Sequence, residues 1–162
     1  MTLAIFAGSF DPPTYGHLNI IERARKMFDK IDVVIAVNPG KKCLFSDSER
    51  LEALKTLVSQ WDNVSVHLWN GLIVDYASSR GAKVMLRGIR NVTDFSYEFD
   101  LSLMNRTLDN SIETLFIPTE QKYVLLKSSS IKELASFGAD VSSMVPPLIA
   151  KMLSEKFGKK RG

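Results

Sequence analysis

The sequence has little of what several classes of protein require. It contains one cysteine, Cys43, and two histidines, so it can form neither an internal disulfide nor a zinc cage of its own side chains. Its aliphatic runs, such as Val33–Val37, have the length of strands and fall far short of the roughly 20 residues of a membrane span. Residues 2–6 lead directly into apparent structure without a basic region or cleavage site, which argues against a secretory signal. We expect a cytoplasmic enzyme or binding protein.

Excess charge of one sign is also scarce outside the end of the sequence. The chain has 21 Lys and Arg against 18 Asp and Glu, a net charge of +3. Four of the basic residues and no acid lie in positions 156–162, so residues 1–155 carry 17 − 18 = −1. A basic body would favour a nucleic-acid partner, and this body is nearly neutral. We therefore expect no nucleic-acid partner, no membrane association and a flexible basic tail over residues 158–162.

The size and composition are those of one globular domain. The chain has 162 residues, of which 45% are hydrophobic and 24% charged. It contains no fixed-period repeat, no low-complexity segment and no linker rich in Pro, Gly or Ser. We therefore expect residues 1–162 to form a single domain.

Short aliphatic segments alternate with segments of helical periodicity along the chain. The strand-like segments alternate only weakly, as strands covered on both faces do, and they span residues 3–6, 32–37, 64–68, 83–86 and 113–117. The helix-like segments span residues 17–28, 46–61, 72–80, 94–108, 128–137 and 146–157. The second of these helices opens with the capping box of Ser46 and Glu49. The alternation predicts an α/β fold, a five-stranded parallel sheet with helices on both faces.

Residues that follow strands rank first as site candidates, because ligands of such sheets bind beyond the carboxyl ends of the strands. After the first strand, Gly8 permits close backbone approach, Ser9 offers a hydroxyl and His17 lies in the first turn of the next helix. The free amides of that turn predict a phosphate site, where His17 would donate to a phosphate whose charge builds up. A solvated histidine in a turn rich in Pro and Gly remains the alternative.

Basic residues follow two further strands. Lys41 and Lys42 come after the second strand, and Arg87 and Arg90 flank Gly88 after the fourth. Two guanidiniums fit bidentate recognition of phosphate, although surface lysines and surface ion pairs are the alternative interpretation. The sequence contains neither GxxxxGK[ST] nor GxGxxG, and no paired-carboxylate or nucleophile-elbow motif. This pattern predicts transfer at a phosphate by positioning and charge neutralisation rather than by covalent catalysis.

Three other residues have chemistry that could be functional, and we interpret them as structural. His67 lies in or just after an edge-like strand, without carboxylate or cysteine company. Met104 and Met152 fall at helix-core spacing, which predicts packing.

The segment 8–17, GSFDPPTYGH, is similar to the T/HxGH signature of the nucleotidylyltransferase superfamily. The chain as a whole resembles the bacterial phosphopantetheine adenylyltransferase family. That resemblance extends in order through NPGK at 38–41, ER at 49–50, GLIVD at 71–75, RGIRNVTDFSYE at 87–98, MNR at 104–106 and SSS at 128–130. The block RGIRNVTDFSYE at 87–98 makes the resemblance specific to this family.

The resemblance implies a Rossmann-like, doubly wound five-stranded parallel sheet. It implies transfer of the adenylyl group of ATP to 4′-phosphopantetheine, giving dephospho-coenzyme A and pyrophosphate in coenzyme A biosynthesis. It also implies Mg²⁺ as cofactor and a homohexamer. The first alternative is another small-molecule adenylyl- or cytidylyltransferase of the superfamily. The second is a catalytically silent nucleotide- or RNA-binding module.

The resemblance also implies roles for particular residues. In-line attack by the acceptor phosphate on the α-phosphorus would proceed without a covalent enzyme intermediate, with no residue assigned to a metal. Transition-state stabilisation is implied for His17, Lys41 and Arg90. Contacts with phosphopantetheine are implied for Ser9, Lys41, Ile73 and Arg87. Contacts with ATP are implied for Ser9, Phe10, His17, Gly88, Ile89, Arg90, Glu98, Tyr123, Val124, Leu125, Leu126, Lys127, Ser128 and Ser129.

Two positions depart from the family pattern. Ala7 stands where the family usually has proline, which alters loop stiffness. In the segment after the fifth strand, a register set by Tyr123 and Lys132 puts Lys127 in place of the first serine and Ser130 in place of an apolar residue. Lys127 would then help to neutralise departing pyrophosphate. The alternative is a loop that bulges by one residue, with Lys127 in water.

Overall fold

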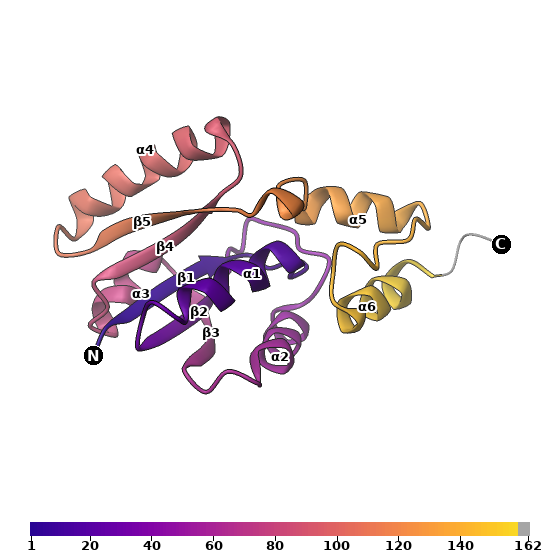
Figure 1. Ribbon diagram of the computed structural model, residues 1–162, viewed down its shortest axis with the longest axis horizontal. Coiled ribbons are helices and arrows are strands. Elements are labelled where there is room, and N and C mark those ends of the chain that lie inside the picture. Colours follow the sequence, from indigo (N-terminus) through magenta and orange to yellow (C-terminus); the bar gives the residue numbers. More distant parts are fainter. Residues whose placement is uncertain (159–162) are drawn as a thin grey trace.

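Five parallel strands form one sheet in the computed structural model, which describes residues 1–158 (Figure 1). The order across the sheet is β3-β2-β1-β4-β5, and every neighbouring pair is parallel. The strands are β1 (Leu3–Gly8), β2 (Lys30–Val37), β3 (Val64–Asn70), β4 (Val84–Ile89) and β5 (Glu113–Pro118). The predicted parallel five-stranded sheet is confirmed. The chain adds β2 and β3 on one side of β1 and then crosses to the other side, where it adds β4 and β5. The topological switch point therefore lies between β1 and β4.

All six predicted helices are present, with a short 3₁₀ turn before the fifth. α1 ends four residues earlier than predicted, and Phe28, placed at its end, instead lies in the turn that leads to β2 and still packs against the core. The capping box of α2 is confirmed: the backbone N–H of Ser46 donates to Glu49, and that of Glu49 donates to the Ser46 hydroxyl. The helices are α1 (Tyr15–Ala24), α2 (Asp47–Val58), α3 (Ile73–Ser79), α4 (Val92–Leu108), α5 (Ser128–Ser136) and α6 (Pro147–Phe157), and the 3₁₀ turn η1 is Gln121–Tyr123.

Helices cover both faces of the sheet, as predicted for weakly alternating strands. In the central strand β1, Ala4 and Phe6 pack with α1 and α2 on one face, while Ile5 packs with α3 on the other. α4 lies on the α3 side, where Phe95 meets Phe116 of β5 edge to face at 5.3 Å between ring centroids. α5 and α6 build a third apolar cluster beside α2.

Each strand extends beyond the aliphatic pattern at one end, and two of these extensions reach the site. Gly8 belongs to β1, and the segment Arg87–Ile89, expected after the fourth strand, forms the last part of β4 and pairs with β5. Backbone pairing does not depend on side-chain polarity, so the ladder continues through the polar residues that approach the site. The predicted basic tail lies outside the described residues, apart from Gly158.

The interpretation of His67 as structural rests on a wrong premise, and that of Met104 as a packing residue is wrong. His67 does have a carboxylate neighbour: its Nε2 lies 3.5 Å from Oδ1 of the buried Asp32, which also accepts hydrogen bonds from Tyr76 and Arg80. The sequence hides this neighbour because β2 and β3 pair across a long separation. Met104 is 58% exposed on α4 and packs into no core, whereas Met152 does pack against the third cluster.

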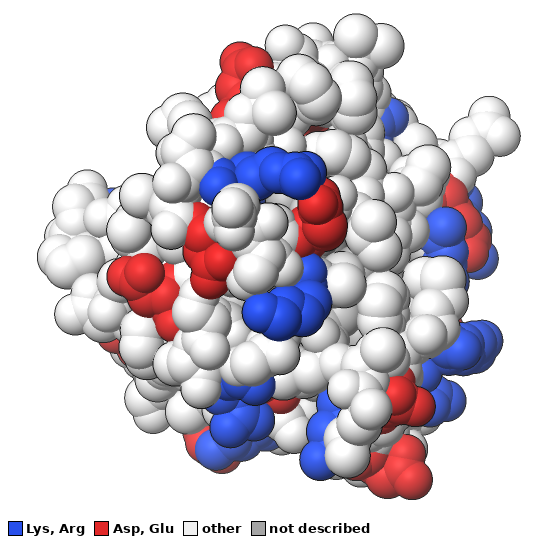
Figure 2. Space-filling view, turned by 90° about the vertical axis from the view of Figure 1, so that its left-hand side faces the viewer, with Lys and Arg blue, Asp and Glu red and all other residues white. Residues whose placement is uncertain are grey.

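The helices of residues 1–158 and one face of the surface bear on the predictions about membranes and nucleic acids. No helix within residues 1–158 is long and apolar enough to cross a membrane. Figure 2 shows that face, where acidic and basic side chains are interspersed.

Candidate active site

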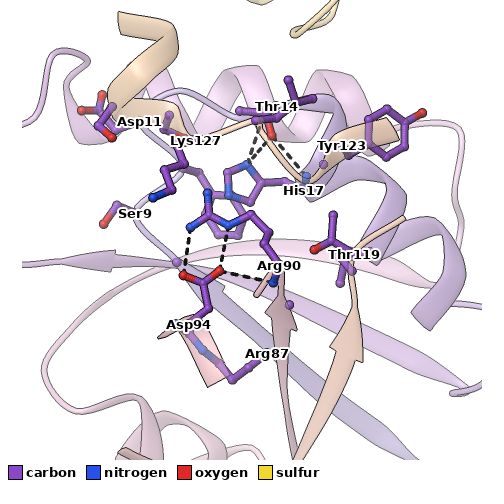
Figure 3. Close-up of a pocket in the computed structure, with 18 of the residues that line it drawn as sticks. Ser9, Asp11, Thr14, His17, Arg87, Arg90, Asp94, Thr119, Tyr123 and Lys127 are labelled. Carbon is purple, nitrogen blue, oxygen red and sulfur yellow. Dashed lines mark hydrogen bonds and ion pairs between the residues drawn. The ribbon is translucent and has the colours of Figure 1, made fainter. Parts of the chain in front are cut away.

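A cavity of about 460 Å³ opens at the carboxyl ends of β1 and β4, the position that the topology favours. Its wall is built from the β1–α1 loop, the end of β4, the first turns of α4 and the start of α5 (Figure 3). Lys41 reaches the cavity from the β2–α2 loop. Polar and cationic side chains from segments far apart in sequence therefore face one space.

His17 is held at this cavity by a reciprocal cap. The Thr14 hydroxyl accepts from the backbone N–H of His17 at 3.3 Å, and the backbone N–H of Thr14 donates to Nδ1 of His17 at 3.0 Å. Nδ1 is thus an acceptor, which leaves the imidazole proton on Nε2. Burial lowers the pKa of His17 to about 4, and the positive charges of Arg90 and Arg87 act in the same direction. At neutral pH His17 is an uncharged donor.

The loop before α1 is shaped by Phe10. Phe10 has a φ of +48° although it carries a side chain, and its buried ring packs edge to face on His17 with 5.0 Å between centroids. Such a backbone conformation persists because the surrounding packing fixes it. A Cβ on Gly8 would meet this ring at 3.4 Å, a tight approach that the absence of a side chain avoids. The ring of Phe10 thereby supports the imidazole of His17 at the cavity.

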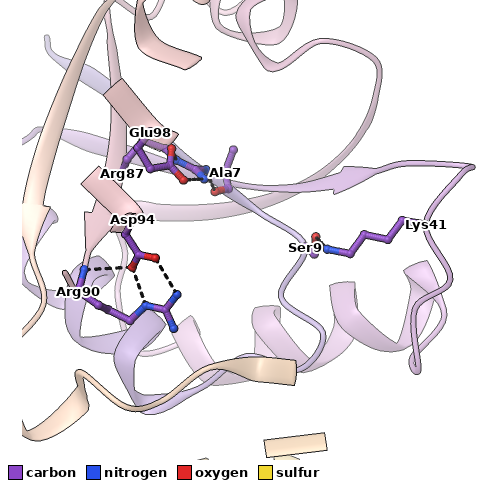
Figure 4. A network of polar contacts seen from close by, with 7 residues as sticks. All are labelled: Ala7, Ser9, Lys41, Arg87, Arg90, Asp94 and Glu98. Carbon is purple, nitrogen blue, oxygen red and sulfur yellow. Dashed lines mark hydrogen bonds and ion pairs between the residues drawn. The ribbon is translucent and has the colours of Figure 1, made fainter. Parts of the chain in front are cut away.

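Ser9 and Lys41 form the side of the cavity next to β2. The ammonium of Lys41 donates to the Ser9 hydroxyl at 2.9 Å (Figure 4). Arg50, which is buried on α2, donates to the Ser9 carbonyl at 2.7 Å and so fixes the backbone that carries the hydroxyl. Lys42 does not line the cavity, so of the two predicted lysines only Lys41 reaches it.

Both arginines of the β4 segment are paired with carboxylates of α4. Arg87 makes a bidentate pair with Glu98, at 2.6 Å for each bond, and donates to the Ala7 carbonyl at 2.7 Å. Arg90 pairs with Asp94 through Nε at 2.9 Å. Figure 4 shows these pairs from close by.

Both ion pairs are partly buried, and a charged pair in that position is stronger than one at the surface. Burial alone would raise the pKa of Asp94, but the hydrogen bond and the charge of Arg90 hold it below its usual range. Asp94 and Glu98 lie one turn apart on α4, so one helix face holds both guanidiniums in place.

The start of α5 supplies a further part of the cavity wall. Lys127 is the N-cap residue of α5 without a side-chain capping bond, and Ser128 donates to the Pro12 carbonyl at 2.8 Å. Lys127, Ser128 and Ser129 line the cavity, whereas Ser130 is exposed and does not. This arrangement favours the register in which Lys127 takes the place of the first serine.

The cavity brings together most of the residues singled out from the sequence. Those that line it are Ser9, Phe10, His17, Lys41, Arg87, Gly88, Arg90, Glu98, Tyr123, Leu126, Lys127, Ser128 and Ser129. Four do not: Ile73 packs with α3, Leu125 is 87% exposed, and Ile89 and Val124 lie outside the lining. Because these four residues lie outside the lining, their positions give no support to their assigned contacts.

Sequence reasoning missed several lining residues. Asp11 and Thr14 fall inside the GSFDPPTYGH segment, which is a signal for both, and Asp94 falls inside the RGIRNVTDFSYE block. Thr119 and Lys132 carry no such signal from spacing alone.

No cluster of three or more His, Cys, Asp and Glu side chains suited to a metal occurs in the described part of the chain. The carboxylates that line the cavity are Asp11, Asp94 and Glu98, and each is engaged by a lysine or arginine.

Comparison with known proteins gives one family over the whole chain. Residues 5–134 match the cytidylyltransferase-like family. The chain is 51% identical to phosphopantetheine adenylyltransferase of Desulfosudis oleivorans, over 98% of this chain and 94% of the relative. It is 47% identical to that of Treponema pallidum strain Nichols, over 95% and 97%, and 46% identical to that of Caldanaerobacter subterraneus, over 98% and 99%.

A solved structure supports the fold alone. A chain from Vibrio parahaemolyticus assigned as a nicotinate-nucleotide adenylyltransferase matches with a TM-score of 0.70 and 17% identity, covering 99% of this chain and 98% of that one.

Proposed function

The chain belongs to the phosphopantetheine adenylyltransferase family, and we propose that it transfers the adenylyl group of ATP to 4′-phosphopantetheine, giving dephospho-coenzyme A and pyrophosphate. The observation that carries the chemistry is the convergence of one neutral histidine donor with lysines and arginines on a single cavity at the switch point. Such a cavity suits a reaction in which two polyanions must approach each other.

The acceptor side is formed by Ser9, Lys41 and Arg87. The Lys41 ammonium and the Ser9 hydroxyl already touch, so a phosphate placed beside them meets two donors at once. Glu98 and Ala7 take three of the five N–H donors of Arg87, as its three hydrogen bonds show. The remaining donors serve the incoming phosphate while Glu98 keeps the guanidinium oriented.

The ATP side is formed by His17, Arg90 and the start of α5. The amides at the N-terminus of α5 and the ammonium of Lys127 suit the β- and γ-phosphates, because a helix start and a lysine both favour anions. His17 would donate from Nε2 to an α-phosphate oxygen.

The chemical step is a single displacement. An oxygen of the phosphopantetheine phosphate forms a bond to the α-phosphorus, and the bond from that phosphorus to the oxygen bridging to the β-phosphate breaks, with pyrophosphate leaving. The Ser9 hydroxyl accepts a hydrogen bond from the Lys41 ammonium and does not give up a proton to it, so this pair does not call for a covalent enzyme intermediate. The fixed donors act by positioning and by charge stabilisation.

We propose that Mg²⁺ enters as part of the nucleotide substrate. Mg²⁺ keeps several waters and is commonly held by substrate phosphates with one or two carboxylates. The cavity carboxylates are already engaged by cations, so they do not form a cage for the ion. The residues therefore fit Mg²⁺ bound to the polyphosphate of ATP, where it would neutralise charge.

We propose a cytoplasmic homohexamer. Support for assembly comes from α4, a helix of 17 residues of which none is buried. It exposes large apolar side chains that a second copy of this chain would cover, namely Val92, Phe95, Tyr97, Phe99, Leu103, Met104 and Leu108. Sedimentation of the purified chain tests this, and a monomer at micromolar concentration would contradict it.

The identity of the acceptor substrate distinguishes this function from that of another adenylyl- or cytidylyltransferase of the superfamily. Pyrophosphate release is measured with ATP and, in turn, 4′-phosphopantetheine, nicotinate mononucleotide and glycerol phosphate. We expect turnover with phosphopantetheine alone. Turnover with one of the other acceptors instead would identify another transferase of the superfamily. Unchanged activity after deletion of residues 158–162 would show that the basic tail has no part in the reaction.

A further inference from the structure

Asp11 joins three segments that are distant in sequence. Its carboxylate accepts from the backbone N–H of Leu44 at 2.9 Å, from that of Phe45 at 2.9 Å, and from the ammonium of Lys132 at 2.7 Å. The residue lies in the β1–α1 loop, its amide partners in the β2–α2 loop, and Lys132 on α5. One side chain thus connects three of the segments that line the cavity.

The carboxylate is buried and charged. Asp11 is 3% exposed. Burial would raise its pKa, but the hydrogen bond from Lys132 and the two backbone amides hold the pKa below its ordinary value. A buried charge that loses its partner costs far more than a surface pair, so the carboxylate keeps its three donors together.

The joined segments carry the two halves of the site. Lys41, on the acceptor side, lies three residues before Leu44 in the same loop. Ser128, on the ATP side, lies one helical turn before Lys132 on α5. The Ser128 hydroxyl also bonds to the Pro12 carbonyl, next to Asp11, so α5 is attached twice to the same loop.

We propose that Asp11 is a positioning residue that sets the spacing between the acceptor side and the ATP side of the cavity. This inference rests on the proposed function for its kinetic test. The bond to Lys132 fixes α5 and thereby the ATP side, while the bonds to Leu44 and Phe45 fix the β2–α2 loop and thereby Lys41. The two attachments are separable, because they use different partners of one carboxylate.

Single substitutions should give a split in KM. Lys132→Met removes the bond between α5 and Asp11 and leaves the bonds of Asp11 to Leu44 and Phe45, so it should raise KM for ATP about tenfold or more and leave KM for phosphopantetheine within about twofold. Lys132→Arg keeps a cation for the carboxylate and should restore most of the ATP use. Asp11→Asn weakens both attachments and should raise both KM values.

The double variant tests whether Asp11 acts on the ATP side through Lys132. In the Lys132→Met background, Asp11→Asn should leave KM for ATP unchanged and still raise KM for phosphopantetheine. Full, additive effects of the two substitutions on ATP would overturn the proposal, and so would an Asp11→Asn variant with both KM values of the wild type.

A matched control separates positioning from loss of stability. Asp32 is 2% exposed, accepts from Tyr76 and Arg80, and does not line the cavity. Asp32→Asn should lower the unfolding temperature and leave both KM values unchanged. Equal changes of KM in the Asp32 and Asp11 variants would reduce Asp11 to a general stabilising residue.

Amide hydrogen exchange gives a readout that does not depend on the identity of the acceptor. Asp11→Asn should speed exchange at Leu44 and Phe45 and in α5, whereas Asp32→Asn should not. If the wild type fails to use phosphopantetheine, the proposed function falls, while this exchange pattern still decides the positioning role. Unchanged exchange at Leu44 and Phe45 in Asp11→Asn would overturn it.

Discussion

The backbone N–H of Thr14 donates to Nδ1 of His17 across 3.0 Å, and this bond sets which nitrogen of the imidazole faces the cavity with a proton. Because Nδ1 is occupied, a phosphate oxygen can meet only the Nε2 proton. Protonation of His17 is unfavourable because burial, followed by the positive charges of Arg90 and Arg87, lowers its pKa.

His17→Ala should lower kcat by about 10²–10³ and change ATP affinity much less, because the lost donor meets charge that develops in the transition state. Steady-state kinetics together with ATP titration of the enzyme measure both quantities. A variant with unchanged kcat and a raised KM for ATP would make His17 a binding residue only.

Acid should destabilise the protein through His17. Its pKa in the folded state is about 4, below the ordinary value of 6.5, so the unfolded chain binds the proton first as pH falls. The stabilising contribution is fully present above pH 6.5 and is lost as pH falls towards 4, in total on the order of 3 kcal/mol.

Unfolding free energies of the wild type and His17→Gln at several pH values between 6.5 and 4 measure this loss. We expect the wild type to lose more stability than the variant over this range. Parallel pH dependence of the two proteins would show that His17 is protonated as readily in the folded chain as in the unfolded one.

Arg87→Ala should chiefly raise KM for phosphopantetheine, and Arg90→Ala should impair the use of ATP. Lysine should rescue poorly at either position, because an ammonium cannot satisfy both oxygens of the partner carboxylate. Kinetics with each substrate varied in turn test this division, and the reverse pattern would contradict it.

A double substitution of Arg87 and its partner Glu98 tests the role of Arg87 in phosphopantetheine binding more directly. Without Arg87, the Glu98 carboxylate faces the incoming phosphate unneutralised. Adding Glu98→Gln to Arg87→Ala should therefore recover part of the lost phosphopantetheine use, although Glu98→Gln alone should be harmful. A double variant as poor as or poorer than Arg87→Ala would mean that Glu98 does not repel the acceptor.

Lys127→Ala should weaken ATP use, and the difference from the wild type should shrink as salt is added, because the lost interaction is between charges. Ser130→Ala should be nearly silent, since Ser130 does not line the cavity. KM for ATP at low and high ionic strength distinguishes the two. Impairment by Ser130→Ala with a silent Lys127→Ala would instead support the bulged loop.

The sequence predicts the sheet and helices well because its local signals agree. Aliphatic strands, the Ser46 cap of α2 and the paired prolines at the start of α6 all act over a few residues, and all are confirmed. The end of β4 was misplaced because Arg87 interrupts the aliphatic pattern without interrupting the ladder.

Long-range partners lie beyond such signals. Asp32 and His67 meet through strand pairing, and Asp11 meets Lys132 across 121 positions of sequence. The pairing of Arg87 with Glu98 requires α4 to lie over β4, which periodicity does not reveal. The cavity lining could therefore be predicted from strand ends and motifs, but the bonds that orient it could not.

The central place of β1 has a consequence for synthesis on the ribosome. β1 pairs with β2, which follows it directly, and with β4, which is made only after β3 and α3. Until β4 emerges, one edge of β1 presents unpaired amides and carbonyls, a template on which another nascent chain can pair. Arg87 lies on β4 and Arg90 directly follows it. The strand that covers the aggregation-prone edge of β1 therefore also brings both arginines to the cavity.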